Sequence, residues 1–386
     1  MVSDIRAAQN SEFVKIRIPA GSGPKSEVKP LEKVDATLRA AKTALDPYEN
    51  DERLVQLLRM VDPYAPLRYK LKKERGGQVV TNAWMKMYEM AGQLGLVPEE
   101  RKEFRVFCNA ELPGAFLCAI NHFVRTKRPG MRLEWVAASL HPGRSRTALG
   151  DQYGLYAGNL DRWLMDRYMR GDLTDPSNVR TLAQRAKERL GGDGVDLYTS
   201  DAGIDVAGDY NRQEELTAKV HLGQVLAGLG ALRVGGSLLV KTYTFTSPFS
   251  ISLVAQLAES FGELYVVKPK ASRLPNSEVY LVGKNYLGGV HAELWATLES
   301  FSYSAPVGPV AANTLTAIAS AARYIHQVRE VAALEAVVRL YLAHRSRLKQ
   351  LKGTLITSSQ THITKWMGDN PVGTLKYNQQ VWAAKK

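Results

Sequence analysis

Four charged residues stand at the ends of apolar stretches or on a neighbouring helix, where side chains can converge on a substrate. Asp201 follows the apolar run VDLYTS, Lys241 follows LLV, and Glu278 precedes VYLVG. Lys86 lies in the helical stretch TNAWMKMYE. Taken singly, a strand-end lysine or glutamate is more often a solvated or edge-strand charge. Taken together, charges at strand ends shift one another's pKa values, as functional sites require.

Lys241 could act in two ways within such a cluster. A nearby aspartate, such as Asp201, favours the charged ammonium, which orients or polarises an oxygen. Burial and a second cation, for which Lys86 is the candidate, would instead lower the pKa of the lysine from its ordinary value of about 10.4 and make it a base. The residues alone leave both roles open.

A glycine turn follows the apolar strand expected over 104–110 and reads NAELPGAF. In open α/β sheets, ligands bind at the carboxyl ends of strands, where such turns let backbone N–H groups approach closely. Gly114 stands directly before an expected helix and suits that role. The turn lacks the three spaced glycines of a dinucleotide-binding motif, so by itself it fits an ordinary strand-to-helix connection somewhat better than a ligand site.

The elements that must position these residues alternate regularly. Short apolar runs predict strands, and the amphipathic segments between these runs predict helices. GDLTD, which comes after a glycine- and arginine-rich stretch, is expected at a further strand-to-loop junction. The expected strands cover 104–110, 133–140, 195–203, 237–243, 263–270 and 278–287, and the expected helices cover 83–97, 115–126, 177–194, 213–236 and 249–262. This alternation favours an α/β fold, a doubly wound and mostly parallel sheet covered on both faces.

The flanking regions differ from this pattern and suggest three segments. Residues 1–79 predict an N-terminal arm, irregular to about residue 35, and a helical extension. Residues 80–290 predict the α/β domain. Residues 291–386 predict a helical, basic C-terminal extension that becomes looser from about Gly353.

Composition limits the partners and the compartment. The 386 residues carry a formal net charge of +13, which favours a polyanionic partner. The two cysteines, Cys108 and Cys118, cannot form a disulfide framework, and the N-terminus lacks a signal-peptide pattern, so we expect a reducing, intracellular setting. No apolar run approaches the roughly 18 residues of a membrane span. The histidines and cysteines show no metal-ligand spacing, so no metal is expected.

The order Lys86, Asp201, Lys241, Glu278 resembles the Lys-Asp-Lys-Glu tetrad of the FtsJ-like RNA ribose 2′-O-methyltransferases. TNAWMKMYE resembles the segment of the first lysine, and NAELPGAF resembles the methyl-donor loop. VGGSLLVKTYTFTSPFS and KPKASRLPNSEVYLVGKNY are most similar to the cap-specific mRNA enzymes of eukaryotes and large viruses. The resemblance covers about 80–285 and implies a Rossmann-like, seven-stranded sheet.

The resemblance also implies a cofactor, S-adenosyl-L-methionine, and a role for each matching residue. Lys241 would be the central catalytic residue, with Lys86 and Glu278 positioning the ribose and Asp201 lying near both the donor and Lys241. The implied cofactor-binding residues are Asn109, Leu112, Pro113, Gly114, Ala115, Phe116, Asp172 and Asp201. Arg273 and Asn276 would contact RNA. The reaction would be an in-line displacement that needs no covalent intermediate.

One departure concerns the ribose of the cofactor. The strand expected over 133–140 ends in Ala138 and Ser139, where many such enzymes carry an acidic residue, and Asp151 is the candidate substitute. Trp84, Tyr88, Trp135 and Trp163 could stack on bases, although core packing explains each of them better.

Three functions remain open at this stage. The favoured one is methylation near the 5′ cap of mRNA, with a capping-complex protein as a candidate partner. The alternatives are methylation of internal rRNA or tRNA riboses, and a non-catalytic RNA-binding scaffold. The expected location is the nucleus for a cellular protein, or a cytoplasmic replication site or virion for a viral one. The oligomeric state is left open.

Overall fold

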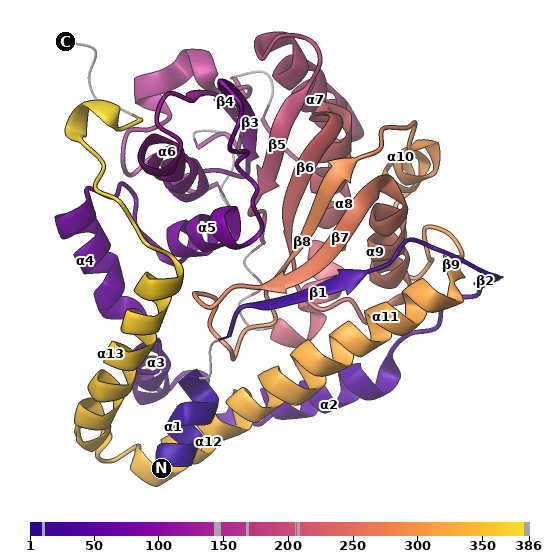
Figure 1. Cartoon of the computed structure of the whole chain (residues 1–386). Helices are drawn as coiled ribbons and strands as arrows, with labels where there is room; N and C mark the ends of the chain where they lie inside the picture. Colours follow the sequence, from indigo (N-terminus) through magenta and orange to yellow (C-terminus); the bar gives the residue numbers. More distant parts are fainter. Residues whose placement is uncertain (10–11, 143–147, 167–169, 205, 207–208, 382–386) are drawn as a thin grey trace.

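A seven-stranded sheet forms the centre of the computed structural model, which describes residues 1–9, 12–142, 148–166, 170–204, 206 and 209–381 (Figure 1). The strand order is β1-β7-β8-β6-β5-β3-β4. The strands are β1 (Val14–Ile18), β3 (Glu103–Asn109), β4 (Arg132–Ala137), β5 (Val195–Ser200), β6 (Leu232–Thr242), β7 (Phe261–Lys268) and β8 (Val279–Tyr286). The pairs among β4, β3, β5 and β6 are parallel, whereas β8 is antiparallel to both β6 and β7. The mostly parallel α/β fold is confirmed.

Helices cover both faces of this sheet, as Figure 1 shows. They are α5 (Asn82–Gln93), α6 (Ala115–Lys127), α7 (Pro176–Arg189), α8 (Gln213–Ala231) and α9 (Pro248–Ser260). The predicted cap of the first is present, because the hydroxyl of Thr81 accepts a hydrogen bond from the Trp84 N–H at 3.3 Å. Trp84, Tyr88, Trp135 and Trp163 are all buried, in agreement with the core interpretation.

The N-terminal segment differs from the irregular arm predicted for it. It begins with the helix α1 (Val2–Gln9) and supplies β1, which pairs with β7 in the register Val14↔Lys268. In VKIRI, Val14 and Ile18 at the ends of the strand are buried, whereas Lys15 is exposed. Five residues between a polar segment and a glycine-containing one carry too little periodic signal to reveal an edge strand.

A second difference concerns GDLTD, which joins no strand. Gly171 and Asp172 lie in an irregular segment, and Asp175 caps α7 by accepting a hydrogen bond from the Ser177 N–H at 2.8 Å. The glycine- and arginine-rich stretch before it includes residues 143–147, which lie outside the described part of the chain.

The helical flanks pack against the sheet domain. The N-terminal flank contains α2 (Glu32–Thr43), the 3-10 turn η1 (Asp46–Tyr48), α3 (Glu52–Met60) and α4 (Ala65–Arg75), and the short strands β2 (Lys25–Ser26) and β9 (Val310–Ala311) pair with each other. The C-terminal flank contains α10 (Ala292–Glu299), α11 (Ala312–Ala322), the π-helical segment η4 (Arg323–Glu330), α12 (Val331–His344), η5 (Leu348–Leu351) and α13 (Lys352–Asp369). In Figure 1, α11 and α12 run beneath the sheet beside α2.

The prediction of a looser end from Gly353 is wrong, because this glycine lies within α13. Trp366 of that helix is fully buried, and its ring lies 6.5 Å from that of Tyr88. The Tyr88 hydroxyl donates to the carbonyl of Pro371 at 3.2 Å. The C-terminal segment therefore forms part of the domain core on the α5 side.

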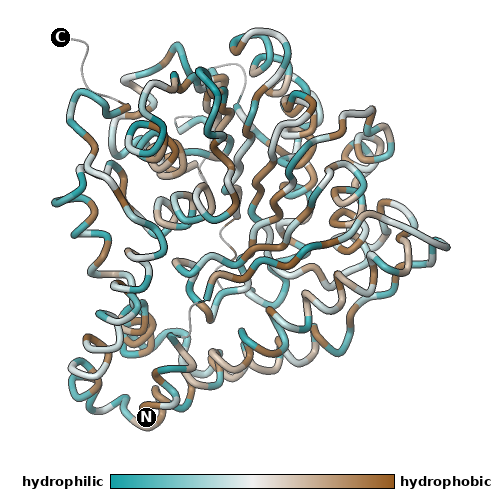
Figure 2. The backbone as a smooth tube through the Cα atoms, viewed as in Figure 1, coloured by the Kyte–Doolittle hydropathy of each residue, from teal (hydrophilic) through white to brown (hydrophobic). Residues whose placement is uncertain are grey.

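Hydropathy follows this architecture, and Figure 2 shows the hydrophobic stretches concentrated in the central strands and the helices against them. Cys108 and Cys118 are both buried and unpaired, on β3 and α6. Among the described residues, none of the helices has the length and apolar character needed to cross a membrane.

Candidate active site

The four charged residues meet at one edge of the sheet, although they come from four separate elements. Asp201 directly follows β5, and Lys241 is the penultimate residue of β6. Because β8 is antiparallel to β6, with Lys241↔Tyr280 and Thr242↔Val279 as partners, the residue that precedes β8 lies beside the end of β6. That residue is Glu278, and α5 brings Lys86 to the same place.

Lys86 and Glu278 form a buried ion pair. The Lys86 Nζ lies 2.5 Å from the Glu278 Oε1, and the two residues are 8% and 6% exposed. The hydroxyl of Ser272 donates to the same oxygen at 3.0 Å. Burial raises the pKa of Glu278, but the charges of Lys86 and Lys241 outweigh it and lower the pKa to about 2. Glu278 is therefore a carboxylate at neutral pH.

Lys241 pairs with the second acid of the cluster. Its Nζ lies 3.4 Å from the Asp201 Oδ1, which also accepts a hydrogen bond from the Tyr280 hydroxyl at 2.9 Å. Burial lowers the pKa of Lys241, but the negative charge of Asp201 and the neighbouring Tyr243 and Glu278 outweigh burial and hold the pKa above its ordinary value. Of the two roles left open, the geometry favours the charged ammonium.

The cluster can therefore hold and polarise an oxygen atom. Two ammonium groups and two carboxylates alternate in a largely buried site, where preorganised charges act more strongly than they do in water. A Cβ atom added at Gly203 would lie 3.0 Å from the Lys241 Nζ, so the backbone after Asp201 passes close to this ammonium.

Several residues that support the tetrad were not predicted. Tyr280 and Ser272 hydrogen-bond the two carboxylates, and Gln224 of α8 donates to the backbone carbonyl of Lys241 at 2.6 Å. Tyr280 stands two positions after Glu278, on the same side of an expected strand, which is a signal that sequence reasoning could have used. Gln224 carries no such signal, because its contact depends on how α8 packs against β6.

The glycine turn after β3 lies at the same edge and is anchored to the end of β4. The Glu111 N–H donates to the Ala138 carbonyl at 3.0 Å, and the Leu112 N–H donates to the Ser139 hydroxyl at 3.2 Å. Gly114 precedes α6 with φ = 113°, a conformation that favours glycine. Burial raises the pKa of Glu111 to about 8, and this carboxyl accepts the Leu117 N–H at 2.9 Å.

The other residues of the turn have distinct positions. Asn109 is buried, donating to the Tyr198 hydroxyl at 3.0 Å and accepting from the Ala110 N–H at 2.8 Å, so its side chain shapes the turn. Pro113 precedes Gly114, and Ala115 begins α6. The Phe116 ring packs in the core, 6.1 Å from that of Tyr280.

Asp172 lies near this edge because the preceding residue, Gly171, packs its backbone against the end of β4. A Cβ atom at Gly171 would lie 2.0 Å from the Ser139 carbonyl oxygen, which shows how closely the segment packs against the end of β4. The Asp172 Oδ1 accepts hydrogen bonds from the N–H and the hydroxyl of Thr174, both at 2.8 Å. Asp151 instead caps a local turn, with Oδ1 and Oδ2 accepting the N–H groups of Tyr156 and Ala157 at 3.0 and 2.8 Å. The Asp151 contact with a cofactor ribose stays a prediction.

A cavity of about 660 Å³ is lined by Ser272, which hydrogen-bonds Glu278, and by Ser277, which directly precedes it, but by none of the four tetrad residues. Its walls combine the 270–277 segment with α2, α3 and the loop before α4, and they include Arg273 and Asn276, both exposed. Asn276 links the cavity to the cluster, because its Oδ1 accepts the Glu278 N–H at 2.8 Å.

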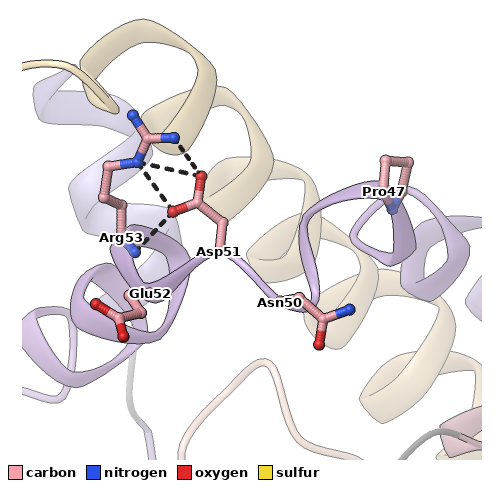
Figure 3. A pocket seen from close by; sticks show the side chains of 5 residues that line it. All are labelled: Pro47, Asn50, Asp51, Glu52 and Arg53. Carbon is pink, nitrogen blue, oxygen red and sulfur yellow. Dashed lines mark hydrogen bonds and ion pairs between the residues drawn. The ribbon is translucent and has the colours of Figure 1, made fainter.

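A second hollow, of about 650 Å³, lies at the start of α3 (Figure 3) and serves the fold. There the Asp51 carboxylate accepts the Arg53 N–H at 2.9 Å and pairs with the guanidinium at 2.6 Å, which caps the helix. The two hollows are similar in volume, but the lining of the first includes Ser272, which hydrogen-bonds Glu278. Within the described part of the chain, no group of three or more His, Cys, Asp or Glu residues could hold a metal ion.

Comparison with known proteins agrees with this geometry. The FtsJ-like methyltransferase family matches residues 79–286, more than half of the chain. The protein therefore belongs to the FtsJ-like methyltransferase family. The match includes all four residues of the cluster.

Individual relatives extend the comparison. A probable methyltransferase, EP424R, of African swine fever virus (isolate Tick/South Africa/Pretoriuskop Pr4/1996) is 35% identical over 94% of this chain and 90% of its own length. The cap-specific mRNA (nucleoside-2′-O-)-methyltransferase 2 of Drosophila melanogaster is 31% identical over 64% of this chain and 36% of its own length. A putative ribosomal RNA methyltransferase structure from Plasmodium falciparum covers 54% of this chain and 99% of its own, with 18% identity and a TM-score of 0.39.

Proposed function

We propose that this methyltransferase transfers a methyl group from S-adenosyl-L-methionine to a ribose 2′-hydroxyl of RNA, near the 5′ cap of mRNA. The observation that carries the proposal is the convergence of Lys86, Asp201, Lys241 and Glu278 at one buried edge, in two ion pairs. Such a cluster suits an oxygen nucleophile that needs orientation and charge stabilisation.

The residues after β3 and β4 suit the methyl donor. The Gly114 turn, Asp172 and Asp201 lie at the carboxyl ends of neighbouring strands, where doubly wound folds bind ligands. Backbone groups and carboxylates there match the amino, hydroxyl and adenine groups of S-adenosyl-L-methionine. When bound, this cofactor supplies a methyl group activated by a sulfonium centre. We propose Asn109, Leu112, Pro113, Gly114, Ala115, Phe116, Asp172 and Asp201 as the residues that form its site.

The tetrad acts on the ribose. Lys241, held as an ammonium by Asp201, donates a hydrogen bond to the 2′-oxygen and orients it, because a protonated amine has no electron pair with which to remove a proton. The hydroxyl proton, which Lys241 does not accept, leaves to water as the 2′-oxygen takes the methyl group. Lys86, fixed by Glu278, whose carboxylate also accepts from Ser272, holds the neighbouring part of the ribose. The negative charge of Glu278 also helps to keep Lys241 charged.

The cavity beside the tetrad supports capped RNA as the substrate. Its volume suits a nucleoside, and the exposed guanidinium of Arg273 suits a phosphate, which it binds in bidentate geometry. Asn276 offers an amide at the junction of cavity and tetrad. The net charge of +13 adds a phosphate attraction that is independent of sequence.

Methylation of two matched transcripts tests the proposal. The two transcripts share one sequence with unmethylated riboses, and they differ only at the 5′ end, which carries a cap in one and a triphosphate in the other. The labelled nucleotide is mapped after digestion. We expect transfer to a 2′-oxygen of a cap-proximal nucleotide and at least tenfold slower transfer to the uncapped RNA, with Lys241→Ala as the inactive control. If structured, uncapped rRNA or tRNA were methylated as fast as the capped transcript or faster, internal riboses of those RNAs would replace the cap-proximal ribose as the assigned substrate. Binding of RNA with no transfer to any of them would favour the scaffold.

A further inference from the structure

A buried carboxylate of the C-terminal flank reaches the segment that carries Glu278. Glu330 ends η4 and is 2% exposed. Its Oε1 accepts a hydrogen bond from the Ser277 hydroxyl at 2.6 Å, and its Oε2 lies 2.8 Å from the Nδ1 of His326, one helical turn earlier. Because Ser277 directly precedes Glu278, this contact fixes the backbone on the amino side of the tetrad carboxylate.

A lysine holds the same backbone through different atoms. The Lys268 Nζ at the end of β7 donates to the carbonyl oxygens of Asn276 and Glu278, the latter at 2.8 Å. Burial lowers the pKa of Lys268 to about 8, while the charges of Glu330 and Glu278 act in the opposite direction. Residues 276–278 are therefore held in two ways. Lys268 donates to the carbonyls of Asn276 and Glu278, and Glu330 accepts from the hydroxyl of Ser277.

The local helix geometry turns Glu330 inward. Between α11 and α12 the chain adopts a π-helical segment, a rare and less favourable form that is often found at functional sites. Within it, His326 is fully buried against the ring of Phe245, whose centroid lies 5.4 Å away, and Glu330 points to the same side. A helix that only had to cover the sheet could bury apolar side chains here, and would avoid the cost of removing a carboxylate from water.

We propose that Glu330 is a positioning residue for methyl transfer: through Ser277, and together with Lys268, it sets the place from which Glu278 holds Lys86. This inference rests on the proposed function. It makes the C-terminal flank, which lies outside the region matched to the family, a part of the catalytic apparatus.

The whole chain of 386 residues tests this through steady-state kinetics of methyl transfer and cofactor binding by calorimetry. We expect Glu330→Ala to lower kcat by roughly ten- to a hundredfold, the scale on which small displacements of catalytic groups act. The KM for RNA and the cofactor Kd should stay within about twofold, because the residue touches neither ligand. Glu330→Gln keeps an acceptor for Ser277 and should recover most of the loss.

Two further variants separate positioning from general destabilisation. Ser277→Ala should lower kcat without a large change in fold, and the double variant with Glu330→Ala should be no worse than the more severe single one, since both break one contact. Thr314→Val is the matched control: it removes another buried hydrogen bond of the same flank, to the Pro19 carbonyl at 3.0 Å. It should lower the melting temperature and leave kcat unchanged.

The outcomes distinguish the two proposals. If the wild-type protein methylates no RNA, the proposed function fails and this inference fails with it. If the wild type is active but Ser277→Ala and Glu330→Ala retain its kcat, or if Thr314→Val loses as much kcat as they do, only the positioning role is refuted.

Discussion

Replacing Glu278 by glutamine tests the charge balance at the centre of the site. The amide keeps an oxygen that can accept from Lys86 and Ser272, but it removes the negative charge between Lys86, Lys241 and Lys268. Lys86 and Lys241 are then left with Asp201 as the remaining carboxylate of the tetrad, while Lys268 keeps the charge of Glu330. The fold must absorb this repulsion or admit water.

Two independent routes give the size of the effect. Removing one partner of a buried ion pair costs about 3–5 kcal/mol, and the retained hydrogen bonds favour the lower end of that range. The lowering of the Glu278 pKa from 4.5 to about 2 corresponds to about 3 kcal/mol, at roughly 1.4 kcal/mol for each pKa unit. We therefore expect Glu278→Gln to reduce the free energy of unfolding by about 3 kcal/mol at pH 7.

The stability difference between wild type and Glu278→Gln should also change with pH, in a direction set by the lowered pKa of Glu278. Because the pKa of Glu278 is lower in the folded protein than in the unfolded chain, its stabilisation is fully present above about pH 4.5 and is lost as the pH falls toward 2. Glutamine does not titrate. The stability gap between wild type and variant should therefore narrow by about 1.4 kcal/mol between pH 7 and pH 3.5.

Urea denaturation followed by tryptophan fluorescence measures this gap at each pH. Glu335→Gln is the control, because the exposed Glu335 pairs with Arg339 at 3.6 Å and should change stability by less than about 0.5 kcal/mol. A Glu278→Gln protein as stable as wild type at pH 7, or a gap that stays constant down to pH 3.5, would refute the electrostatic reasoning.

Four other predictions follow from the site and its surroundings. Lys241→Ala should abolish methyl transfer while the cofactor Kd stays within about twofold, as calorimetry can check. The raised pKa of Lys241 keeps its ammonium charged, so the wild-type single-turnover rate should not rise between pH 7 and pH 9; a tenfold rise per pH unit would show instead that the free amine is required. Arg273→Ala should raise the KM for capped RNA, and the salt dependence of this KM should become no steeper. An unchanged KM would remove this residue from the RNA site. Trp366→Ala should lower the free energy of unfolding by about 3–5 kcal/mol, since α13 packs this side chain into the core; a change near zero in urea denaturation would contradict that.

The candidate site was predictable because its signals are local. Each tetrad residue stands beside a short apolar run or on an amphipathic helix, and the carboxyl ends of parallel strands necessarily share an edge. The fold class followed from the same alternation. The roles of Lys241 were not separable by this route, because its protonation depends on a 3.4 Å contact with Asp201 across two strands.

The flanks were predicted less well because their structure depends on contacts distant in sequence. β1 is a strand only because the exposed edge of β7 offers backbone partners some 250 residues away. α13 lacks a clear apolar stripe, yet it is ordered by burying Trp366 beside Tyr88. Single-segment periodicity carries no information about such partners.

Both flanks lie outside the family-matched region, and both line the cavity that the 270–277 segment also lines. The N-terminal flank supplies walls of the cavity beside Glu278, and the C-terminal flank supplies Glu330 behind it. A substrate that enters the cavity would therefore meet residues of both flanks, and in the proposed positioning role Glu330 also fixes the segment that carries Glu278. Because the C-terminal flank buries Trp366 in the core, its removal would unfold the domain, so the point variants Glu330→Ala and Ser277→Ala are the informative test of its part in catalysis. We propose that the two flanks are parts of one active site rather than appendages to it.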